Sequence, residues 1–321
     1  LKQIDSIYPN GLEGKTFLDC ACNAGGYGFW MAERGIKHGF GFDVRDHWIS
    51  QAKFIQANRT VGPTEQLEYI VSDLYDVPKI RLEPFDVTLT GLLAQQDVHS
   101  HLVTDHYHYF KPGGSTYHSA FTTWDFIRGQ EADPWASTVT PNLDRYRELY
   151  HADQLETERG GFRYQAMINR DRIVDLADFP CVRTFDSALS FLRENRDSDN
   201  WFLQLETFDP HEPFHAPKKF RDRYPTNYAG PVYDWPRYRK AGRETADEAA
   251  NLRANYAALV ALCDAQLGRV LDQFDQADMW KDTALIVTTD HGFLLGEHDW
   301  WGKNRMPFYN QIAHIPLMLS L

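Results

Sequence analysis

An apolar run at residues 284–289 (Ala-Leu-Ile-Val-Thr-Thr) leads directly into Asp290, His291 and Gly292. A short apolar run that is bounded by polar residues and a glycine predicts a buried strand. A second run at residues 201–205 also ends in polar residues, and apolar side chains recur at helical spacing over residues 244–276 between the two runs. This pattern predicts an α/β fold in which a long amphipathic helix covers one face of a sheet.

Composition limits the class of protein. A chain of 321 residues is long enough for one large or two modest domains. The net charge of -12 argues against broad nucleic-acid binding, which needs clustered Lys and Arg. No apolar run approaches the roughly 18 residues of a membrane helix, so no membrane partner is expected. The few cysteines predict reduced thiols, not a disulfide scaffold: Cys20, Cys22, Cys181 and Cys263.

The first ninety residues predict an open parallel sheet with a ligand at one edge. A strand at residues 16–20 is followed by a small polar turn that contains Asn23 and Gly25, and then by a helix. Two further strands end in acidic residues, at Asp43 and Asp73. Ligands of such sheets lie beyond the carboxyl ends of the strands, where acidic side chains accept hydrogen bonds from ribose hydroxyls. The segment therefore predicts a site for a nucleoside-containing ligand.

Residues 17–26, together with Asp43 and Asp73, resemble the ordered motifs of a class I S-adenosylmethionine-dependent methyltransferase. The resemblance implies that Asp19, Asn23 and Gly25 line the methionine side of the cofactor, Asp43 its ribose and Asp73 its adenine. It covers residues 1–90 only, and the remaining strands of that fold do not follow. We therefore expect an incomplete Rossmann-like half-sheet that binds S-adenosylmethionine weakly at best.

Histidine, acid and lysine residues cluster in the second part of the chain. Prolines around His211 hold it beyond the strand at residues 201–205, where a histidine kept charged can serve as a general acid. Asp290 and His291 predict ligands of a divalent cation: the carboxylate suits Ca²⁺, Mg²⁺ or Mn²⁺, whereas the imidazole favours Mn²⁺ or Zn²⁺. Lys303 offers a compact cation for an anionic oxygen.

Residues 91–321 resemble the sulfatase family of the alkaline-phosphatase-like superfamily. The resemblance rests on motifs in the family's order: residues 102–109, 124–131, 209–213, 288–292, 296–298 and 301–303. It implies an α/β/α sandwich, truncated here, in which Asp290 and His291 bind a divalent cation, Ca²⁺ foremost with Mg²⁺ or Mn²⁺ as alternatives. Lys303 and His211 would contact the sulfate and His108 would support the nucleophile, although His106 stands where the family often has a lysine. The implied substrate is a small anionic ester of the sulfated-sugar or aryl-sulfate class.

The sequence departs from that family at the nucleophile. None of its 16 prolines has Cys, Ser or Thr two positions earlier, so the motif that is converted to formylglycine is absent, as is the paired-Asp metal motif. Without a nucleophile the covalent route cannot proceed, and we expect an impaired sulfate ester hydrolase that lacks its N-terminal nucleophile segment and its C-terminal part.

Three alternatives remain open from the sequence. In the first, the chain is a methyltransferase-like cofactor binder. In the second, it is a non-catalytic composite of two fragments joined near residue 90. In the third, it is a hydrolase of the same superfamily that cleaves phosphodiesters or phosphonate esters. The two expected domains are residues 1–90 and 91–321. The sequence assigns neither a cellular location nor an oligomeric state.

Overall fold

The computed structural model describes residues 12–20, 22, 25–43, 45–60, 62–71, 89–94, 96–111, 117–155, 161–307 and 309–320. The chain forms two compact units. The first comprises residues 1–100 and 108–122, and the second comprises residues 101–107 and 123–321.

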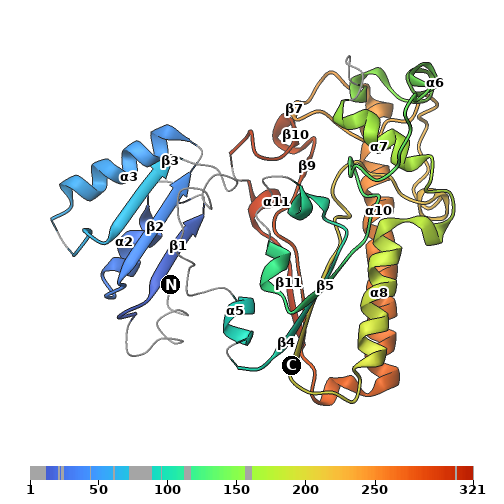
Figure 1. The fold of residues 1–321 in the computed structure, drawn as a ribbon. Coiled ribbons are helices and arrows are strands. Elements are labelled where there is room, and N and C mark those ends of the chain that lie inside the picture. Colours follow the sequence, from blue (N-terminus) through green and yellow to red (C-terminus); the bar gives the residue numbers. More distant parts are fainter. Residues whose placement is uncertain are drawn as a thin grey trace. The chain divides into compact units, whose positions relative to one another are not determined.

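The first unit is built on a three-stranded parallel sheet. Its order is β1 (Thr16–Cys20), β2 (His38–Asp43), β3 (Leu67–Val71), with β2 in the middle. Helices α2 (Gly26–Ala32) and α3 (Asp46–Asn58) connect the strands, as parallel pairing requires. Five of the six residues of β2 are buried, which explains its nearly unbroken apolar sequence. The parallel strands that the sequence predicts in this segment are therefore present (Figure 1).

Short elements complete this part of the chain. They are α5 (Leu89–Ala94) and two 3₁₀ turns, Tyr107–Phe110 and Tyr117–Ala120. A turn at residues 96–97 follows α5.

The second unit contains a three-stranded sheet in the order β5 (Thr123–Phe126), β4 (His99–Thr104), β6 (Trp201–Glu206). Strands β4 and β5 are parallel, with Leu102 opposite Trp124. The predicted strand at residues 201–205 is confirmed. All six residues of β6 are only half-buried, so the prediction that this strand is buried was too strong.

Two long helices, α8 (Pro180–Glu194) and α10 (Ala246–Ala277), form the core of the second unit (Figure 1). They pack on each other, and α8 also packs on β6. Helix α10 begins with a capping box, in which Glu248 N–H donates to Thr245 Oγ1 at 3.2 Å and Thr245 N–H donates to Glu248 Oε2 at 2.7 Å. Its bounds confirm the helix predicted over residues 244–276. Helix α8 begins at Pro180, a residue that suits the first position of a helix.

Strand β8 (Leu285–Thr288) pairs with β11 (Leu317–Ser320) in an antiparallel sheet. It was predicted to be buried, and that prediction was wrong: burial alternates along β8, and Ile286 is 60% exposed. The alternation is what a strand with one covered face shows, because successive side chains point to opposite faces. Leu285 packs against the helical core, whereas Ile286 lies on the other face.

Two strands between Asp290 and Lys303 in the sequence join an earlier strand in a small antiparallel sheet. Its order is β7 (Arg239–Lys240), β10 (Trp300–Gly302), β9 (Leu294–Leu295). The remaining α-helices of this unit are α6 (Leu143–Leu149), α7 (Phe162–Arg170), α9 (Lys218–Arg221) and α11 (Asn310–Ala313). Its 3₁₀ turns are Ala152–Gln154, Leu176–Asp178, Met279–Lys281 and Glu297–Asp299. Over the described residues, none of the helices has the length and apolar character that a membrane crossing requires.

Candidate active site

The loop after β6 places His211 beyond the end of the strand. Its backbone is held at several points: Phe208 N–H donates to Asp105 Oδ1 at 2.6 Å, and His211 N–H donates to the Phe208 carbonyl at 2.9 Å. Further along, Phe214 N–H donates to the Asp234 carbonyl at 2.8 Å. Because these bonds satisfy the backbone where the prolines prevent regular structure, the loop holds one conformation around His211.

The His211 ring has one nitrogen fixed and the other available. Nδ1 lies 2.6 Å from the Glu212 carbonyl oxygen, which can only accept, so Nδ1 carries the hydrogen. The ring packs against Phe208, with centroids 4.1 Å apart. Burial, with the charges of Lys303 and His291, lowers the pKa of His211 to about 4. At neutral pH the ring is therefore neutral with its lone pair on Nε2, and it serves as an acid only once a bound anion raises that pKa.

Lys303 follows β10 and is almost fully buried. Gly302 precedes it with φ +107, a conformation that favours glycine, and a side chain there would collide with the Tyr238 ring. Burial lowers the pKa of Lys303, whereas the carboxylates of Glu212, Asp290 and Glu131 act in the opposite direction. The Lys303 ammonium is thus held among carboxylates in a place with little water.

Asp290 and His291 leave β8 side by side. Asp290 Oδ1 accepts from the His291 backbone N–H at 2.8 Å, and Asp290 Oδ2 lies 3.3 Å from His291 Nε2. His291 Nδ1 donates to the Gly292 carbonyl at 2.9 Å, so Nε2 carries the lone pair. Gly292 is required here, because a Cβ would lie 1.8 Å from the Gln311 carbonyl oxygen of α11.

A carboxylate oxygen and an imidazole lone pair this close are chemically suited to one divalent cation. They supply two donors only. In the part of the chain that the structure describes, no group of three or more His, Cys, Asp or Glu side chains is arranged to hold a metal ion. Asp290 and His291 therefore supply only part of the ligand set of a metal site.

Sequence reasoning missed three residues at this site, Glu131, Glu212 and Tyr238. Glu212 is buried: its Oε1 accepts from the Tyr238 hydroxyl, and its Oε2 lies 3.3 Å from His211 Nδ1. Burial raises the pKa of Glu212, and Lys303 opposes that rise. The carboxylate of Glu131 acts on His211, Lys303 and Tyr238 alike. Position next to His211 was a signal for Glu212, whereas nothing in the sequence marked Tyr238.

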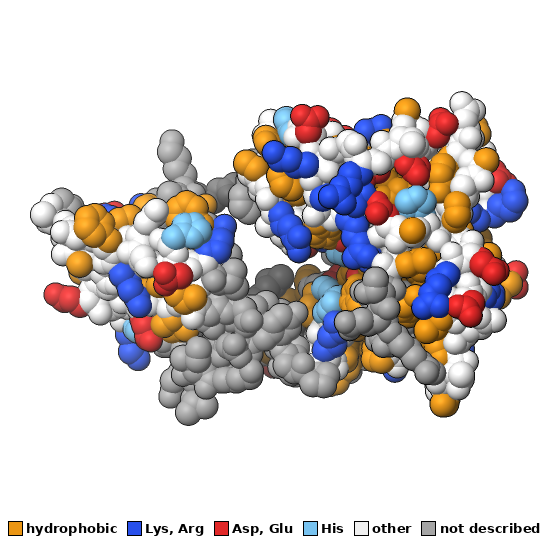
Figure 2. Space-filling model, turned by 90° about the horizontal axis from the view of Figure 1, so that it is seen from above, with side chains coloured by type: hydrophobic (Ala, Val, Ile, Leu, Met, Phe, Trp, Pro, Cys, Tyr) orange, Lys and Arg blue, Asp and Glu red, His pale blue; other side chains and the backbone are white. Residues whose placement is uncertain are grey.

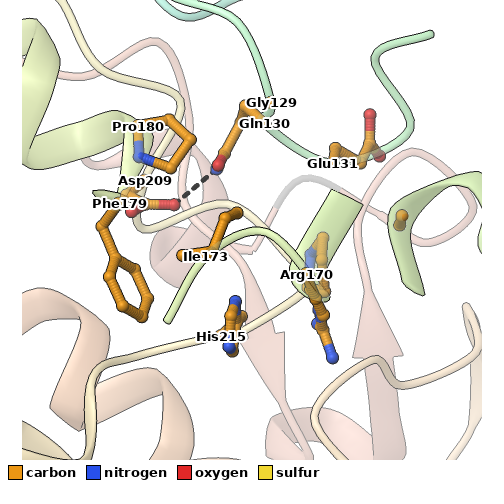
Figure 3. A pocket seen from close by; sticks show the side chains of 11 residues that line it. Gly129, Gln130, Glu131, Arg170, Ile173, Phe179, Pro180, Asp209 and His215 are labelled. Carbon is orange, nitrogen blue, oxygen red and sulfur yellow. Dashed lines mark hydrogen bonds between the residues drawn. The ribbon is translucent and has the colours of Figure 1, made fainter. Parts of the chain in front are cut away.

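Two buried acids, Asp209 and Asp105, lie next to the start of the loop that carries His211. Asp209 accepts from Gln130 Nε2 at 2.6 Å at a cavity of about 20 Å³, and Figure 3 shows this bond beside Arg170 and His215. Burial raises the pKa of Asp209 to about 7. Burial and the neighbouring Asp209 raise the pKa of Asp105 well above its usual range. A cavity this small holds water, not a substrate.

The predicted histidines are separated. His108 lies in the 3₁₀ turn Tyr107–Phe110 in the first unit, so the structure does not relate it to His211 or Lys303. His106 pairs with Glu206 at 3.0 Å, and His101 stacks on Phe191. These two histidines are therefore in contact with residues of β6 and α8.

The structure describes three of the five cofactor residues predicted in the first unit, namely Asp19, Gly25 and Asp43. Asn23 and Asp73 lie outside the described residues, and Asp19 belongs to β1. Gly25 has φ +79 and its carbonyl accepts from the Tyr69 hydroxyl at 3.1 Å. Both oxygens of Asp43 accept from Arg45, at 2.8 and 2.9 Å. Asp43 must therefore share or release Arg45 before it can bind a ribose.

A model of the sulfatase family matches residues 63–320. The chain belongs to the sulfatase family. The match includes the site of the second unit, and it begins within the 1–90 segment that resembles a methyltransferase. Membership of this family supports a hydrolase with an alkaline-phosphatase-like α/β fold. Proteins of the family typically bind a divalent metal ion.

Among curated relatives, this sulfatase-family chain is 26% identical to human iduronate 2-sulfatase over 166 residues, which cover 43% of this chain and 30% of the relative. It is 38% identical to dog arylsulfatase K over 97 residues, 30% of this chain and 18% of the relative. It thus matches less than a third of each relative's length. A solved phosphonate monoester hydrolase from Agrobacterium radiobacter shares 16% identity at a TM-score of 0.47, covering 74% of this chain and 53% of that one.

Proposed function

We propose that the second unit binds the oxyanion of a small ester, a sulfated sugar or an aryl sulfate, between Lys303 and His211. The supporting observation is that three separate segments bring Lys303, His211 and His291 together: Lys303 Nζ lies 3.2 Å from His291 Nε2, and the Lys303 charge helps lower the pKa of His211. Figure 2 looks onto the end of the molecule that carries β7 and β10, where Lys and Arg side chains gather despite the net negative charge. Such a local field attracts an anion.

The residues have distinct roles in this proposal. The Lys303 ammonium neutralises charge on a sulfate oxygen. The bound sulfate ester anion raises the pKa of His211, and Nε2, the nitrogen not held by the Glu212 carbonyl, then carries the proton that it gives to the leaving oxygen. Asp290 and His291 would hold a divalent cation, Ca²⁺ foremost, which would supply Lewis-acid polarisation of the ester.

We further propose that these 321 residues by themselves hydrolyse sulfate esters poorly. The sequence offers no Cys or Ser in the nucleophile motif, and two metal donors alone hold a cation weakly. Loss of a covalent nucleophile typically costs several orders of magnitude in rate. With 4-nitrophenyl sulfate and Ca²⁺, we expect turnover at least about a thousandfold below that of an intact sulfatase. Turnover at a comparable rate would contradict this proposal.

Binding tests the anion site independently of turnover. By isothermal titration of the whole chain with sulfate, we expect Lys303→Met and His211→Gln each to weaken binding about tenfold, the contribution of one charge-assisted hydrogen bond. The matched control is Lys281→Met, which removes an exposed lysine that pairs with Asp278. Unchanged sulfate affinity in Lys303→Met would refute the proposed anion contact.

Phosphate and methylphosphonate belong in the same titration, because a lysine and a histidine bind any tetrahedral oxyanion. Tighter binding of these two than of sulfate would favour a phosphodiester or phosphonate ester as the substrate. S-adenosylmethionine binding by the first unit stays a separate prediction, tested by titration of the cofactor against Asp43→Ala.

A further inference from the structure

Lys303 and His291 are in direct contact, and the direction of their hydrogen bond is determined by chemistry. His291 Nδ1 is 2.9 Å from the Gly292 carbonyl oxygen, so Nδ1 carries the ring hydrogen and Nε2 is left with its lone pair. Lys303 Nζ is 3.2 Å from this Nε2. An ammonium has donors only, and therefore Lys303 donates to His291 Nε2.

This lone pair is the one that a metal ion would use. An imidazole nitrogen has a single lone pair in the ring plane, which cannot accept a hydrogen bond and ligate a cation together. Asp290 Oδ2, the other candidate donor, is 3.3 Å from the same nitrogen, so a cation held by both would lie on the side where Nε2 is engaged. Resting on the proposed cation role of Asp290 and His291, we propose that Lys303 is a built-in competitor of the divalent cation: its ammonium and the metal ion bind His291 Nε2 in mutually exclusive states.

The surroundings of Lys303 give the displaced ammonium a new partner. Of the carboxylates that act on Lys303, Glu212 has the largest effect, and Glu131 also contributes. Glu212 Oε2 is buried and accepts no hydrogen bond from the residues that the structure describes. A buried carboxylate oxygen in this state is costly, and an ammonium that turns to it removes the cost. Entry of the cation therefore moves Lys303 from His291 towards Glu212 without leaving its charge unpaired.

The proposal predicts the effect of removing the competitor. In the 321-residue chain, Lys303→Met keeps the length of the buried side chain but cannot donate to His291. We expect Mn²⁺ to bind this variant about tenfold more tightly than the unaltered chain, as loss of one competing charge-assisted bond implies. Free Mn²⁺ is measured by electron paramagnetic resonance. Lys281→Met, which removes an exposed lysine elsewhere, should bind Mn²⁺ as the unaltered chain does. Equal or weaker binding by Lys303→Met, or no Mn²⁺ binding by any variant, overturns the proposal.

A spectroscopic measurement distinguishes loss of the hydrogen bond at His291 Nε2 from the mere loss of the lysine charge. In chains labelled with ¹⁵N-histidine, the His291 signals are assigned by their loss in His291→Ala. In the absence of metal, Lys303→Met should shift the Nε2 resonance of His291 towards that of a free acceptor nitrogen. Added Cd²⁺ should bring both chains to the same metal-bound shift, and the spectra also report whether each variant is folded. An unchanged Nε2 resonance in metal-free Lys303→Met overturns the proposal, whereas failure of the unaltered chain to bind sulfate contradicts only the proposed function.

Discussion

At the scale of single residues, Asp209 links stability to pH. Its carboxyl is fully buried and its pKa is raised to about 7, whereas an aspartate in the unfolded chain titrates near 4. Between these two pH values the folded state holds a proton that the unfolded state has lost. The contribution of this bound proton to the stability of the folded chain is complete below about pH 4 and disappears as the pH rises through 7. Asp209→Asn keeps an acceptor for Gln130 and removes the buried charge. We expect it to increase the free energy of unfolding at pH 8 by roughly 2–4 kcal/mol.

The measurement is urea denaturation of both chains at pH 5 and pH 8. The gain should fall to about a third at pH 5, where the unfolded chain has already lost this proton, and it should vanish only below about pH 4. Asp171→Asn is a useful comparison, because Asp171 is partly exposed and pairs with Arg145, so its loss should not stabilise the chain at pH 8. A gain of equal size at both pH values would show that Asp209 does not titrate as described.

At the scale of elements, Gly292 determines how closely β8 and α11 approach. Its Cβ would lie 1.8 Å from a carbonyl oxygen of α11, and its own N–H donates to the Ile312 carbonyl at 2.9 Å. Gly292→Ala must therefore shift the backbone, and we expect a loss of roughly 1–3 kcal/mol in the free energy of unfolding, measured with urea. Gly268→Ala in α10 is the control: nothing lies within 4 Å, so it should stabilise the chain by roughly 0.5–1 kcal/mol. If both substitutions have the same effect, the close approach is not rigid.

At the scale of the whole molecule, the β8–β11 sheet leaves an apolar face in solvent. Register places Leu319 opposite Ile286 and Leu317 opposite Thr288, so the three apolar side chains share one face. Ile286 is 60% exposed, Leu317 is 70% exposed and Leu319 is 55% exposed. Exposed apolar strands associate with other chains. We expect concentration-dependent self-association in sedimentation velocity, reduced by Ile286→Thr with Leu319→Thr. Val139→Thr, at an isolated exposed position, is the control, and an equal effect there would contradict this assignment.

The sequence predicted most elements because their signals are local. The apolar repeat of α10 and its capping box lie within one segment, and so do the strands β1 to β3 with their glycine turn. Burial was less predictable: β8 reads as a buried strand, yet whether its second face is covered depends on neighbours that the strand's own residues do not specify.

The sequence by itself determined which chemical groups the site contains: the motifs around His211, Asp290, His291 and Lys303 mark them, and the absent Cys or Ser motif marks what is missing. Only the tertiary structure decided their states. The fold half-buries His211 and lowers its pKa, places Glu212 against Tyr238, and sets Lys303 at the lone pair of His291. The physical reason is that desolvation and hydrogen-bond partners come from segments far apart in the chain, whereas a motif records only the identity of its own side chains. The Asp290-His291-Gly292 stretch therefore predicts a cation site, and the structure adds the ammonium that competes for it.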